Sequence, residues 1–461
     1  MSFSSIGLMP ELVNRLSALG YVSPTPIQQQ AIPAILAGQD VMARAQTGTG
    51  KTAAFTLPIV QLLVLKAHQD NNACPVKAHA ISALILAPTR ELAIQVHENV
   101  ETLLQGVSIP ILAQSDSLAQ INPLALKSAC VYGGVSIDNQ AKRLRAGVDI
   151  LVATPGRLLD HVNRGNAHFN DLAFLVLDEA DRMLDLGFKD EINHIFKLLN
   201  KSQEQYDSHN RQCRQTLLFS ATFTSTVFAL SQKWLNKPVL IELDETNTSA
   251  IHVEQIVYQV DNDKKMAVIN HLIKPSSSSQ SPSFTSGGNR HKENEPEQQV
   301  LVFCRKKQDV DKLVQYLQQQ GSPAHALHGD LSQSVREQVL NQFKQRDILL
   351  LVATDVAARG LDVNGLERVI NYELPFKAED YVHRIGRTGR AGNSGKAITL
   401  YSEDDALLLE QIETLLDKRL PQQWLTGFEP DLTKSAPVSY KNTKAAQKKR
   451  ARRRALSGKK R

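Results

Sequence analysis

Short apolar runs alternate with helix-length segments along most of the chain. Six of these runs end in a small or polar residue: ALILAP (83–88), DILVAT (149–154), FLVLDE (174–179), TLLFSAT (216–222), QVLVFC (299–304) and ILLLVAT (348–354). Uniformly apolar runs of this length are typical of strands buried on both faces of a parallel sheet. The segments between them leave room for crossover helices, so the pattern predicts an α/β fold with helices on both faces of each sheet.

A partial repeat suggests two similar halves. The segment LVATPGR (151–157) returns in part as LVATDVAARG (351–360), and the polar break LDETNTSAIH (243–252) lies between the two copies. We therefore expect one domain over residues 1–245, a hinge at the break, and a second domain over residues 250–425.

Four segments have the composition of additions to these domains. Residues 275–297 are rich in Ser, Pro, Gly and charge, which predicts a mobile surface loop, and residues 200–212 are similar. Residues 106–128 are less polar and lengthen another connection. Residues 432–461 are dominated by Lys and Arg and can bury almost nothing, so we expect a disordered basic tail.

Composition excludes several classes of protein. The chain has 461 residues, of which 42% are hydrophobic and 22% charged, as in ordinary globular proteins. No run approaches the roughly 18 apolar residues of a membrane span, and the first residues lack the basic start of a secretory signal. The cysteines are far apart and form no CxxC pair, which argues against a zinc ribbon or a disulfide framework: Cys74, Cys130, Cys213 and Cys304. Scattered thiols suit a reducing compartment, so we expect a cytoplasmic protein with no membrane partner.

The net charge of +6 hides an asymmetry. Residues 434–461 hold twelve Lys or Arg and no acidic residue, which leaves the rest of the chain with 41 basic against 47 acidic residues. A basic tail on a mildly acidic body favours binding to nucleic acid. Two alternatives stay open: a solvated tail that only adds solubility, and a nuclear localisation signal.

The strongest motif is AQTGTGKT (45–52), which follows the short run DVMA. It fits a phosphate-binding loop except that Ala45 stands where the usual pattern has Gly. Small residues allow backbone N–H groups to surround a phosphate, Lys51 can reach the β- and γ-phosphates, and Thr52 can ligate Mg²⁺. The predicted nucleotide-binding loop consists of Ala45, Gln46, Thr47, Gly48, Thr49, Gly50, Lys51 and Thr52.

Acidic residues end the run FLVLDEAD (174–181). Asp178, at the end of a strand, can hold Mg²⁺, partly through water, and Glu179 is then placed to polarise an attacking water. Together with the phosphate loop, this acidic motif indicates a nucleotide hydrolase.

A cluster of cations in the second half completes this chemistry. The segment HRIGRTGR (383–390) contains His383, Arg384, Arg387 and Arg390. Arginines that reach the γ-phosphate stabilise the charge of phosphoryl transfer, so Arg387 and Arg390 are candidates for that role. A basic surface helix that binds nucleic acid is the alternative for this segment alone.

The motifs PTPIQ, AQTGTGKT, PTREL, GG, TPGR, DEAD, SAT, HGD, ARGLD and HRIGRTGR occur in this order between residues 3 and 390. In this the chain resembles the DEAD-box RNA helicases of superfamily 2, and around DLGF (185–188) it is most similar to the bacterial RhlE-type branch. The resemblance implies two tandem RecA-like domains that close on ATP, Mg²⁺ and RNA together.

The resemblance also implies roles for individual residues. Phe3 would stack on adenine and Gln28 would read its edge, although Tyr21 stands where the family usually has Phe. Gly360 and Asp362 would contact the nucleotide from the second domain, and Ser220 and Thr222 would couple hydrolysis to duplex opening. The implied RNA-binding residues are Thr89, Arg90, Gly134, Thr154, Gly156, Arg157, Gly329, Gln333, Arg336 and Thr354.

The expected function is therefore RNA-stimulated ATP hydrolysis coupled to local unwinding of short RNA duplexes or to remodelling of RNA–protein complexes. RNA binding should be largely independent of base sequence, because such contacts reach the backbone. An ATP-dependent RNA clamp with slow hydrolysis has the same motifs and stays an alternative, as does a P-loop ATPase acting on DNA. We expect a monomer, with ribosome-assembly or RNA-decay proteins as possible partners.

Overall fold

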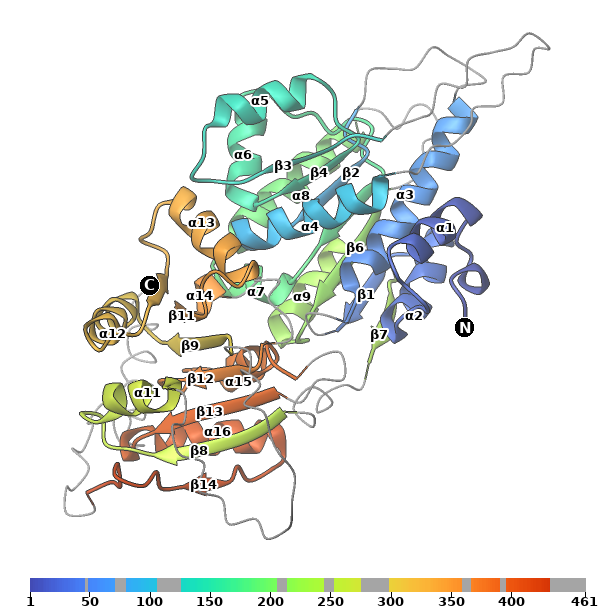
Figure 1. The fold of residues 1–461 in the computed structure, drawn as a ribbon. Coiled ribbons are helices and arrows are strands. Elements are labelled where there is room, and N and C mark those ends of the chain that lie inside the picture. The colour runs from blue at the N-terminus through green and yellow to red at the C-terminus, as the bar shows by residue number, and fades with distance from the viewer. Residues whose placement is uncertain are drawn as a thin grey trace, which may run out of the picture. The chain divides into compact units, whose positions relative to one another are not determined.

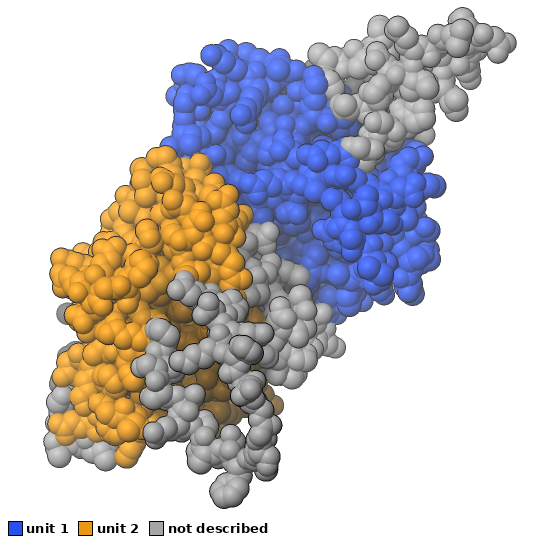
Figure 2. Space-filling model, in the orientation of Figure 1, with its two compact units in different colours: residues 1–245, 360–362 blue, residues 246–359, 363–461 orange. Residues whose placement is uncertain are grey.

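The computed structural model describes residues 1–45, 49–70, 80–105, 126–204, 214–243, 253–274, 298–358, 366–389 and 395–431. The chain divides into two compact units: unit 1 consists of residues 1–245 and 360–362, and unit 2 of residues 246–359 and 363–461 (Figure 2). The expected hinge and the three inserted stretches lie wholly or mostly outside the described residues, and the basic tail 432–461 lies outside them entirely.

Unit 1 is built around a seven-stranded sheet in which all neighbouring strands are parallel. From one edge to the other the order is β3 (Ser128–Val131), β4 (Ile150–Ala153), β2 (Ala83–Leu86), β5 (Phe174–Leu177), β6 (Gln215–Ser220), β1 (Val41–Arg44) and β7 (Val239–Glu242). Successive side chains of a strand point to opposite faces, so Leu84 and Ile85 lie in different hydrophobic cores, and both are buried. The sheet is thus covered on both sides.

Helices supply the rest of each core (Figure 1). One core receives side chains from α1 (Pro10–Ala18), α2 (Pro26–Leu36), α3 (Lys51–Asp70) and α4 (Arg90–Leu104). The other receives them from α5 (Ile137–Arg145), α6 (Pro155–Asn163), α7 (Ala180–Asp185), α8 (Lys189–Glu204) and α9 (Ser225–Trp234). A short 3-10 helix, η1 (Ser4–Ile6), precedes α1.

Local sequence explains where several of these helices begin. Helices α1, α2 and α6 start with Pro10, Pro26 and Pro155, a position where proline's fixed φ suits the helix and its missing N–H costs nothing. Helix α4 is capped by Thr89, whose Oγ1 accepts a hydrogen bond from Leu92 N at 3.3 Å. The PTPIQ, TPGR and PTREL motifs are therefore also helix starts.

Unit 2 repeats the strand order of unit 1 with a second seven-stranded parallel sheet. Its strands run β10 (Ala324–Leu327), β11 (Leu350–Thr354), β9 (Val300–Cys304), β12 (Arg368–Asn371), β13 (Gly395–Tyr401), β8 (Val253–Gln259) and β14 (Gln422–Gln423). Strands β4 and β11 occupy equivalent places, and they carry the repeated LVAT segment.

The helices of unit 2 are α11 (Lys265–Ile273), α12 (Lys307–Gln319), α13 (Gln333–Lys344), α14 (Asp355–Ala358), α15 (Ala378–Ile385) and α16 (Ala406–Leu416), with the 3-10 helix η3 (Glu403–Asp405) before the last. The fold continues past residue 425, because Phe428 lies against His271 with ring centroids 5.4 Å apart and Lys264 Nζ donates to Glu429 O at 2.7 Å. Within the described ranges, no helix combines the length and apolarity that crossing a membrane requires.

The predicted fold class is confirmed. All six apolar runs contain strands, namely β2, β4, β5, β6, β9 and β11, and each lies inside its sheet rather than at an edge. The other strands are shorter, less uniformly apolar or closer to a sheet edge, which is why the pattern did not mark them.

Candidate functional site

The predicted residues of unit 1 divide into two groups along one edge of the sheet. Parallel strands all end at the same edge, so the loops that follow them are neighbours. The loops after β1 and β5 carry the residues predicted to bind phosphate and metal, and the end of β6 and the loop after it carry the predicted coupling residues Ser220 and Thr222. The loops after β2, β3 and β4 carry the residues predicted to bind RNA. In the order β3-β4-β2-β5-β6-β1-β7, each group occupies three consecutive strands.

Backbone hydrogen bonds hold these loops in register one residue beyond the strands. Ala45 N donates to Ser220 O at 3.0 Å, and Asp178 N donates to Leu86 O at 2.9 Å. On the other side Ala87 N donates to Ala153 O at 3.0 Å and Thr154 N donates to Val131 O at 3.1 Å. The Asp178–Leu86 bond therefore joins the nucleotide group to the RNA group.

The described part of the phosphate loop consists of Ala45 and of Thr49 to Thr52; Gln46, Thr47 and Gly48 lie outside the described residues. Gly50 has a φ of 90°, and a Cβ there would lie 2.6 Å from Gln28 Nε2, so this position requires glycine. Lys51 begins α3 and is buried, yet its Nζ has no hydrogen-bond partner among the described residues.

Asp178 is also buried and incompletely bonded. Its side chain is 2% exposed, and its Oδ1 finds no hydrogen-bond partner in the described ranges. Burial raises the pKa of Asp178 to about 6, an effect that nearby Lys51 opposes and Glu179 reinforces. A buried ammonium and a buried carboxylate oxygen without partners fit a phosphate and a hard cation, which would satisfy both.

Glu179 has a left-handed backbone, with a φ of 51°, immediately before α7. Its Oε2 lies 3.3 Å from Arg182 Nη1, and both side chains are less than a tenth exposed. A left-handed conformation at a residue other than glycine is strained and is common at functional sites.

Asp181 connects the acidic turn to the SAT segment after β6. Its Oδ2 accepts hydrogen bonds from Thr222 N at 2.9 Å and from Thr222 Oγ1 at 2.7 Å, while Asp181 N donates to Ser220 Oγ at 3.3 Å. The structure thus brings both predicted coupling residues into contact with the turn that holds Asp178 and Glu179. No role was predicted for Asp181 from the sequence, although it is the last residue of the DEAD motif.

The two predicted adenine-contacting residues are buried in this structure. Gln28 Nε2 donates to Gly50 O at 3.1 Å and its Oε1 accepts from Thr25 N at 2.9 Å, so the carboxamide reaches the phosphate loop from α2. Phe3 is 4% exposed and lies in the hydrophobic core with α2. Stacking of Phe3 on adenine would require its ring to be uncovered, and the adenine roles of both residues stay predictions.

On the RNA side, Arg90 lies against the GG pair. Gly134 has a φ of 88°, and a Cβ on it would come within 2.2 Å of Arg90 Nη1. Only glycine allows both this backbone conformation and the close approach of the guanidinium. Thr89, which caps α4, immediately precedes Arg90 in the sequence.

Arg157 of the TPGR segment is held by Val135 and Gln140, neither of which was predicted as a site residue. Its Nη1 donates to Val135 O and to Gln140 Oε1, both at 3.0 Å, and Gln140 Oε1 is also 3.1 Å from His161 Nε2. Thr154 occupies the N-cap position of α6 without a side-chain capping hydrogen bond, and a Cβ on Gly156 would have no neighbour within 4 Å. No motif or spacing distinguishes Gln140 and His161 from ordinary helix residues.

The predicted residues of unit 2 also lie at the carboxyl ends of strands. Gly329 follows β10, Thr354 ends β11, and Gln333 and Arg336 lie in the first turn of α13. Gln333 Nε2 donates to Glu337 Oε1 at 2.9 Å, and both Gln333 and Arg336 are buried. The predicted RNA residues of unit 2 therefore lie in the half of the sheet that begins at the edge strand β10. Those of unit 1 lie in the equivalent half, which begins at the edge strand β3.

The HRIGRTGR segment follows β12 and begins in the last turn of α15. His383 lies half-buried on that helix, Arg387 is buried just after it, and Arg390 is outside the described residues, as are Gly360 and Asp362. The roles predicted for these residues are not tested by their positions.

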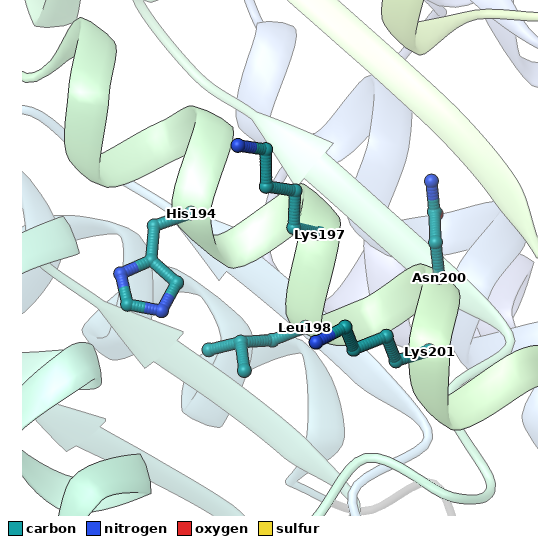
Figure 3. Close-up of a pocket in the computed structure, with 5 residues that line it drawn as sticks. All are labelled: His194, Lys197, Leu198, Asn200 and Lys201. Carbon is teal, nitrogen blue, oxygen red and sulfur yellow. The ribbon is translucent and has the colours of Figure 1, made fainter.

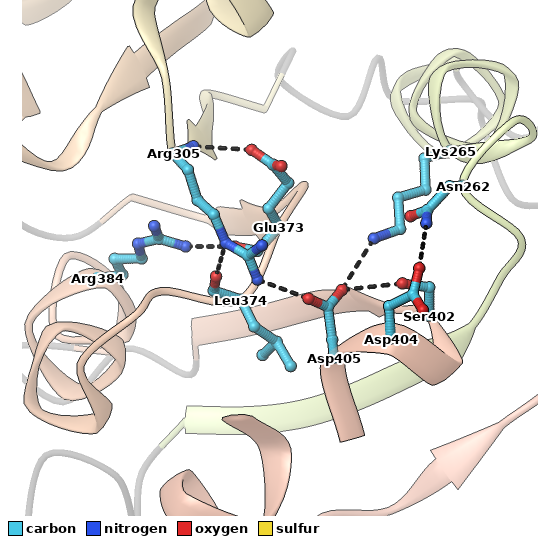
Figure 4. Close-up of polar contacts among 9 residues, drawn as sticks. All are labelled: Asn262, Lys265, Arg305, Glu373, Leu374, Arg384, Ser402, Asp404 and Asp405. Carbon is cyan, nitrogen blue, oxygen red and sulfur yellow. Dashed lines mark hydrogen bonds and ion pairs between the residues drawn. The ribbon is translucent and has the colours of Figure 1, made fainter. Parts of the chain in front are cut away.

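Arg384, in contrast, has a structural position. It is 1% exposed, and its Nε and Nη2 donate to the two oxygens of Asp355 at 2.5 and 2.7 Å. Its Nη1 donates to Asn371 Oδ1 at 3.2 Å. The same nitrogen donates to Glu373 O at 2.6 Å (Figure 4). One arginine therefore ties α14, β12 and α15 together.

A second buried charge network lies beside it in Figure 4. Asp405 accepts hydrogen bonds from Arg305 Nη2 at 2.7 Å, Lys265 Nζ at 3.3 Å and Ser402 Oγ at 3.0 Å. Burial acts to raise the pKa of Asp405, but Lys265 and Arg305 outweigh it and hold the pKa below its ordinary value. Burial lowers the pKa of Lys265 in turn.

A shallow hollow on the surface of α8 holds none of the predicted residues. It is lined by His194, Lys197, Leu198, Asn200 and Lys201, all from that one helix (Figure 3). Side chains of a single exposed helix do not converge on a ligand, so we assign it no function.

Comparison with known proteins decides the family. The DEAD/DEAH box helicase family matches residues 25–230, and the helicase conserved C-terminal domain family matches residues 287–392. The ATP-dependent RNA helicase CshA of Listeria monocytogenes is 38% identical over 418 residues, which cover 91% of this chain and 69% of CshA. The chain belongs to the DEAD-box RNA helicases. The DEAD-box ATP-dependent RNA helicase RhpA of Helicobacter pylori is 37% identical, over 91% of this chain and 73% of RhpA.

The fold of this DEAD-box helicase is similar to that of S. cerevisiae Dbp5 bound to RNA and ADP BeF3. The TM-score is 0.71 at 26% identity, covering 92% of this chain and 95% of Dbp5. The two parallel sheets are the tandem RecA-like domains that the motifs implied. Neither CshA nor RhpA carries the name of the RhlE-type branch, so the assignment of this chain to that branch stays a prediction.

We expect Asp178→Asn to stabilise unit 1 when no nucleotide is present. A carboxyl whose pKa is raised from 3.8 to about 6 on folding destabilises the fold above that pH, and the effect fades as pH falls toward the unfolded value. The neutral amide should therefore raise the free energy of unfolding by roughly 2–3 kcal/mol near pH 8 and by less near pH 5. Thermal melting at both pH values measures this.

The neighbouring variant Asp181→Asn is the matched control. Its carboxylate accepts three hydrogen bonds, from Arg182 N at 3.0 Å and from the N and Oγ1 of Thr222, so this variant should lower the melting temperature. An Asp178→Asn protein that melts below wild type near pH 8 would contradict our account of the buried charge.

We expect Arg384→Lys to destabilise unit 2 by about 3 kcal/mol, because lysine cannot make the forked bond to Asp355 and leaves buried acceptors unpaired. Urea denaturation measures the change. Arg346→Lys, at an ion pair whose arginine is 51% exposed, should change stability by less than about 0.5 kcal/mol. Normal stability of Arg384→Lys together with lost ATPase activity would instead assign Arg384 to the nucleotide.

Proposed function

We propose that this chain is an RNA-stimulated ATPase that locally opens short RNA duplexes or remodels RNA–protein complexes. Its relatives CshA and RhpA are named ATP-dependent RNA helicases. The DEAD/DEAH box helicase family matches the first half of the chain, and the helicase conserved C-terminal domain family matches the second half.

One observation carries this proposal. In both sheets the residues assigned to RNA follow strands of one half, β3-β4-β2 in unit 1 and β10-β11 in unit 2. The predicted phosphate, metal and coupling residues of unit 1 follow β1, β5 and β6, and the HRIGRTGR segment of unit 2 follows β12 on the other half of its sheet. Two ligands on adjacent halves of one edge can influence each other through the hydrogen bonds that join β2 to β5 at their boundary.

We assign ATP and Mg²⁺ to the nucleotide half of unit 1. Lys51 would neutralise the β- and γ-phosphates, and Thr52 and Asp178 would hold Mg²⁺, with the carboxylate acting partly through water. When bound, Mg²⁺ neutralises charge on the phosphate oxygens. Glu179 would orient and polarise the attacking water, and Arg387 and Arg390 would stabilise charge on the transferred phosphate.

The route from hydrolysis to RNA would start at Asp181. Its hydrogen bonds to Thr222 tie the acidic turn to the SAT segment, so a movement of Asp178 or Glu179 would be transmitted through Asp181 to the loop that follows β6. The Asp178–Leu86 bond reaches β2, whose loop carries Thr89 and Arg90. Both connections are short and lie in buried or half-buried surroundings.

RNA binding would use backbone N–H groups and side chains at helix starts, which favour phosphates and read no bases. We further propose that the basic tail tethers RNA and so adds affinity that depends on salt. A cytoplasmic location, a monomeric state, and partners from ribosome assembly or RNA decay are also proposals that rest on sequence.

The proposal is tested by ATP turnover of the full chain with and without RNA, combined with strand separation of a short RNA duplex at catalytic enzyme concentration. We expect strong RNA stimulation and multiple-turnover unwinding. Glu179→Gln should retain ATP and RNA binding and lower turnover by about 10²-fold or more, because the polarising carboxylate is lost. Glu11→Gln, an exposed acidic residue of α1, is the control and should behave as wild type.

Three outcomes would contradict the proposal. ATP turnover that RNA does not stimulate would contradict the assignment of a helicase function. Hydrolysis with only stoichiometric strand separation would favour the RNA clamp, and equal stimulation by DNA would favour a DNA-directed ATPase.

A further inference from the structure

Gln140 is a buried polar side chain at the meeting point of three segments. It is 6% exposed and lies on α5. Its Nε2 donates to Tyr132 O at 3.0 Å, and its Oε1 accepts from Arg157 Nη1 at 3.0 Å and faces His161 Nε2 at 3.1 Å. One carboxamide thus joins the loop after β3, helix α5 and helix α6.

The donors and acceptors around Gln140 fix its orientation. The amide nitrogen faces a carbonyl, and the amide oxygen faces an arginine, so exchanging them would oppose donor to donor at Arg157. His161 is fully buried and donates from Nε2, while Asn166 Nδ2 lies 3.5 Å from its Nδ1. Burial lowers the pKa of His161, which agrees with a neutral ring beside Arg157.

The segments that Gln140 joins are those assigned to RNA in unit 1. Tyr132 and Val135 flank the GG pair, and Arg157 Nη1 donates to Val135 O at 3.0 Å in addition to its bond to Gln140. Both hydrogens of that nitrogen are therefore used to hold the loop after β3 against the start of α6. The loop also contacts Arg90 through Gly134.

We propose that Gln140 is a positioning residue for RNA binding: it fixes Arg157 and the GG loop relative to each other without contacting RNA itself. This inference rests on the proposed function. Truncation at Gln140 would remove the hydrogen bond to Tyr132 O and leave Arg157 Nη1 with one of these two acceptors, so the two RNA-binding segments would lose their fixed spacing. The nucleotide half follows different strands and should be little affected.

The test measures the RNA concentration for half-maximal ATPase stimulation, the KM for ATP, and the melting temperature of full-length variants. Gln140→Ala should raise the RNA half-saturation about tenfold, the loss expected for a buried hydrogen bond to a charged group. It should change the KM for ATP by less than about twofold. Asn139→Ala removes the neighbouring exposed amide on the same helix and should match wild type.

A double-mutant cycle separates positioning from a general structural role. If Gln140 acts through Arg157, adding Gln140→Ala to Arg157→Ala should raise the RNA half-saturation by less than about twofold more. Gln140→Glu keeps an acceptor for Arg157 but cannot donate to Tyr132 O, so it should recover part of the RNA affinity. This variant provides the test if the alanine variant does not fold.

Three results would overturn the inference: wild-type RNA half-saturation for Gln140→Ala, a full tenfold effect in the Arg157→Ala background, or no recovery by Gln140→Glu. Each of these results differs from failure of the proposed function, in which the wild-type chain itself shows neither RNA binding nor stimulation of its ATPase by RNA. If the proposed function fails in that way, the inference about Gln140 fails as well.

Discussion

Backbone hydrogen bonds one residue beyond the strands of unit 1 set the spacing of four functional loops in that unit. Because all its strands are parallel, their loops emerge at one edge, and these bonds hold Ala45, Ala87, Thr154 and Asp178 against neighbouring strands. The bond from Asp178 N to Leu86 O crosses from the nucleotide half to the RNA half. The two predicted binding regions therefore share a rigid boundary.

Buried charges in this protein fall into two kinds. Arg384 and Asp405 have most of their hydrogen-bonding capacity satisfied by neighbouring groups and hold elements of unit 2 together. Lys51 Nζ and Asp178 Oδ1 are as deeply buried but have no partners among the described residues. Leaving such groups unpaired destabilises the fold, and that cost is removed when a ligand of complementary charge binds.

The sequence predicted the features that depend on local pattern. Apolar runs marked the central strands, and small residues with Lys51 marked the phosphate loop, because each has a composition that few other structures need. Contacts between distant segments could not be predicted in the same way. Arg384 and Arg387 stand in one basic segment, and only the packing of α15 against Asp355 shows that the first has a structural place.

Gln140 illustrates the same limit. Its role depends on Tyr132 and Arg157, which come from other elements, and an isolated glutamine in an amphipathic helix gives no signal. Phe3 is a further case, because a terminal aromatic residue can be exposed or buried, and here the core encloses it.

The central claim is that the two halves of the edge are thermodynamically coupled. The most direct measurement is the affinity for a non-hydrolysable ATP analogue with and without RNA, together with the affinity for RNA with and without the analogue. We predict that each ligand tightens binding of the other by the same factor, of about fivefold or more. Affinities for each ligand that do not change when the other is present would contradict the account.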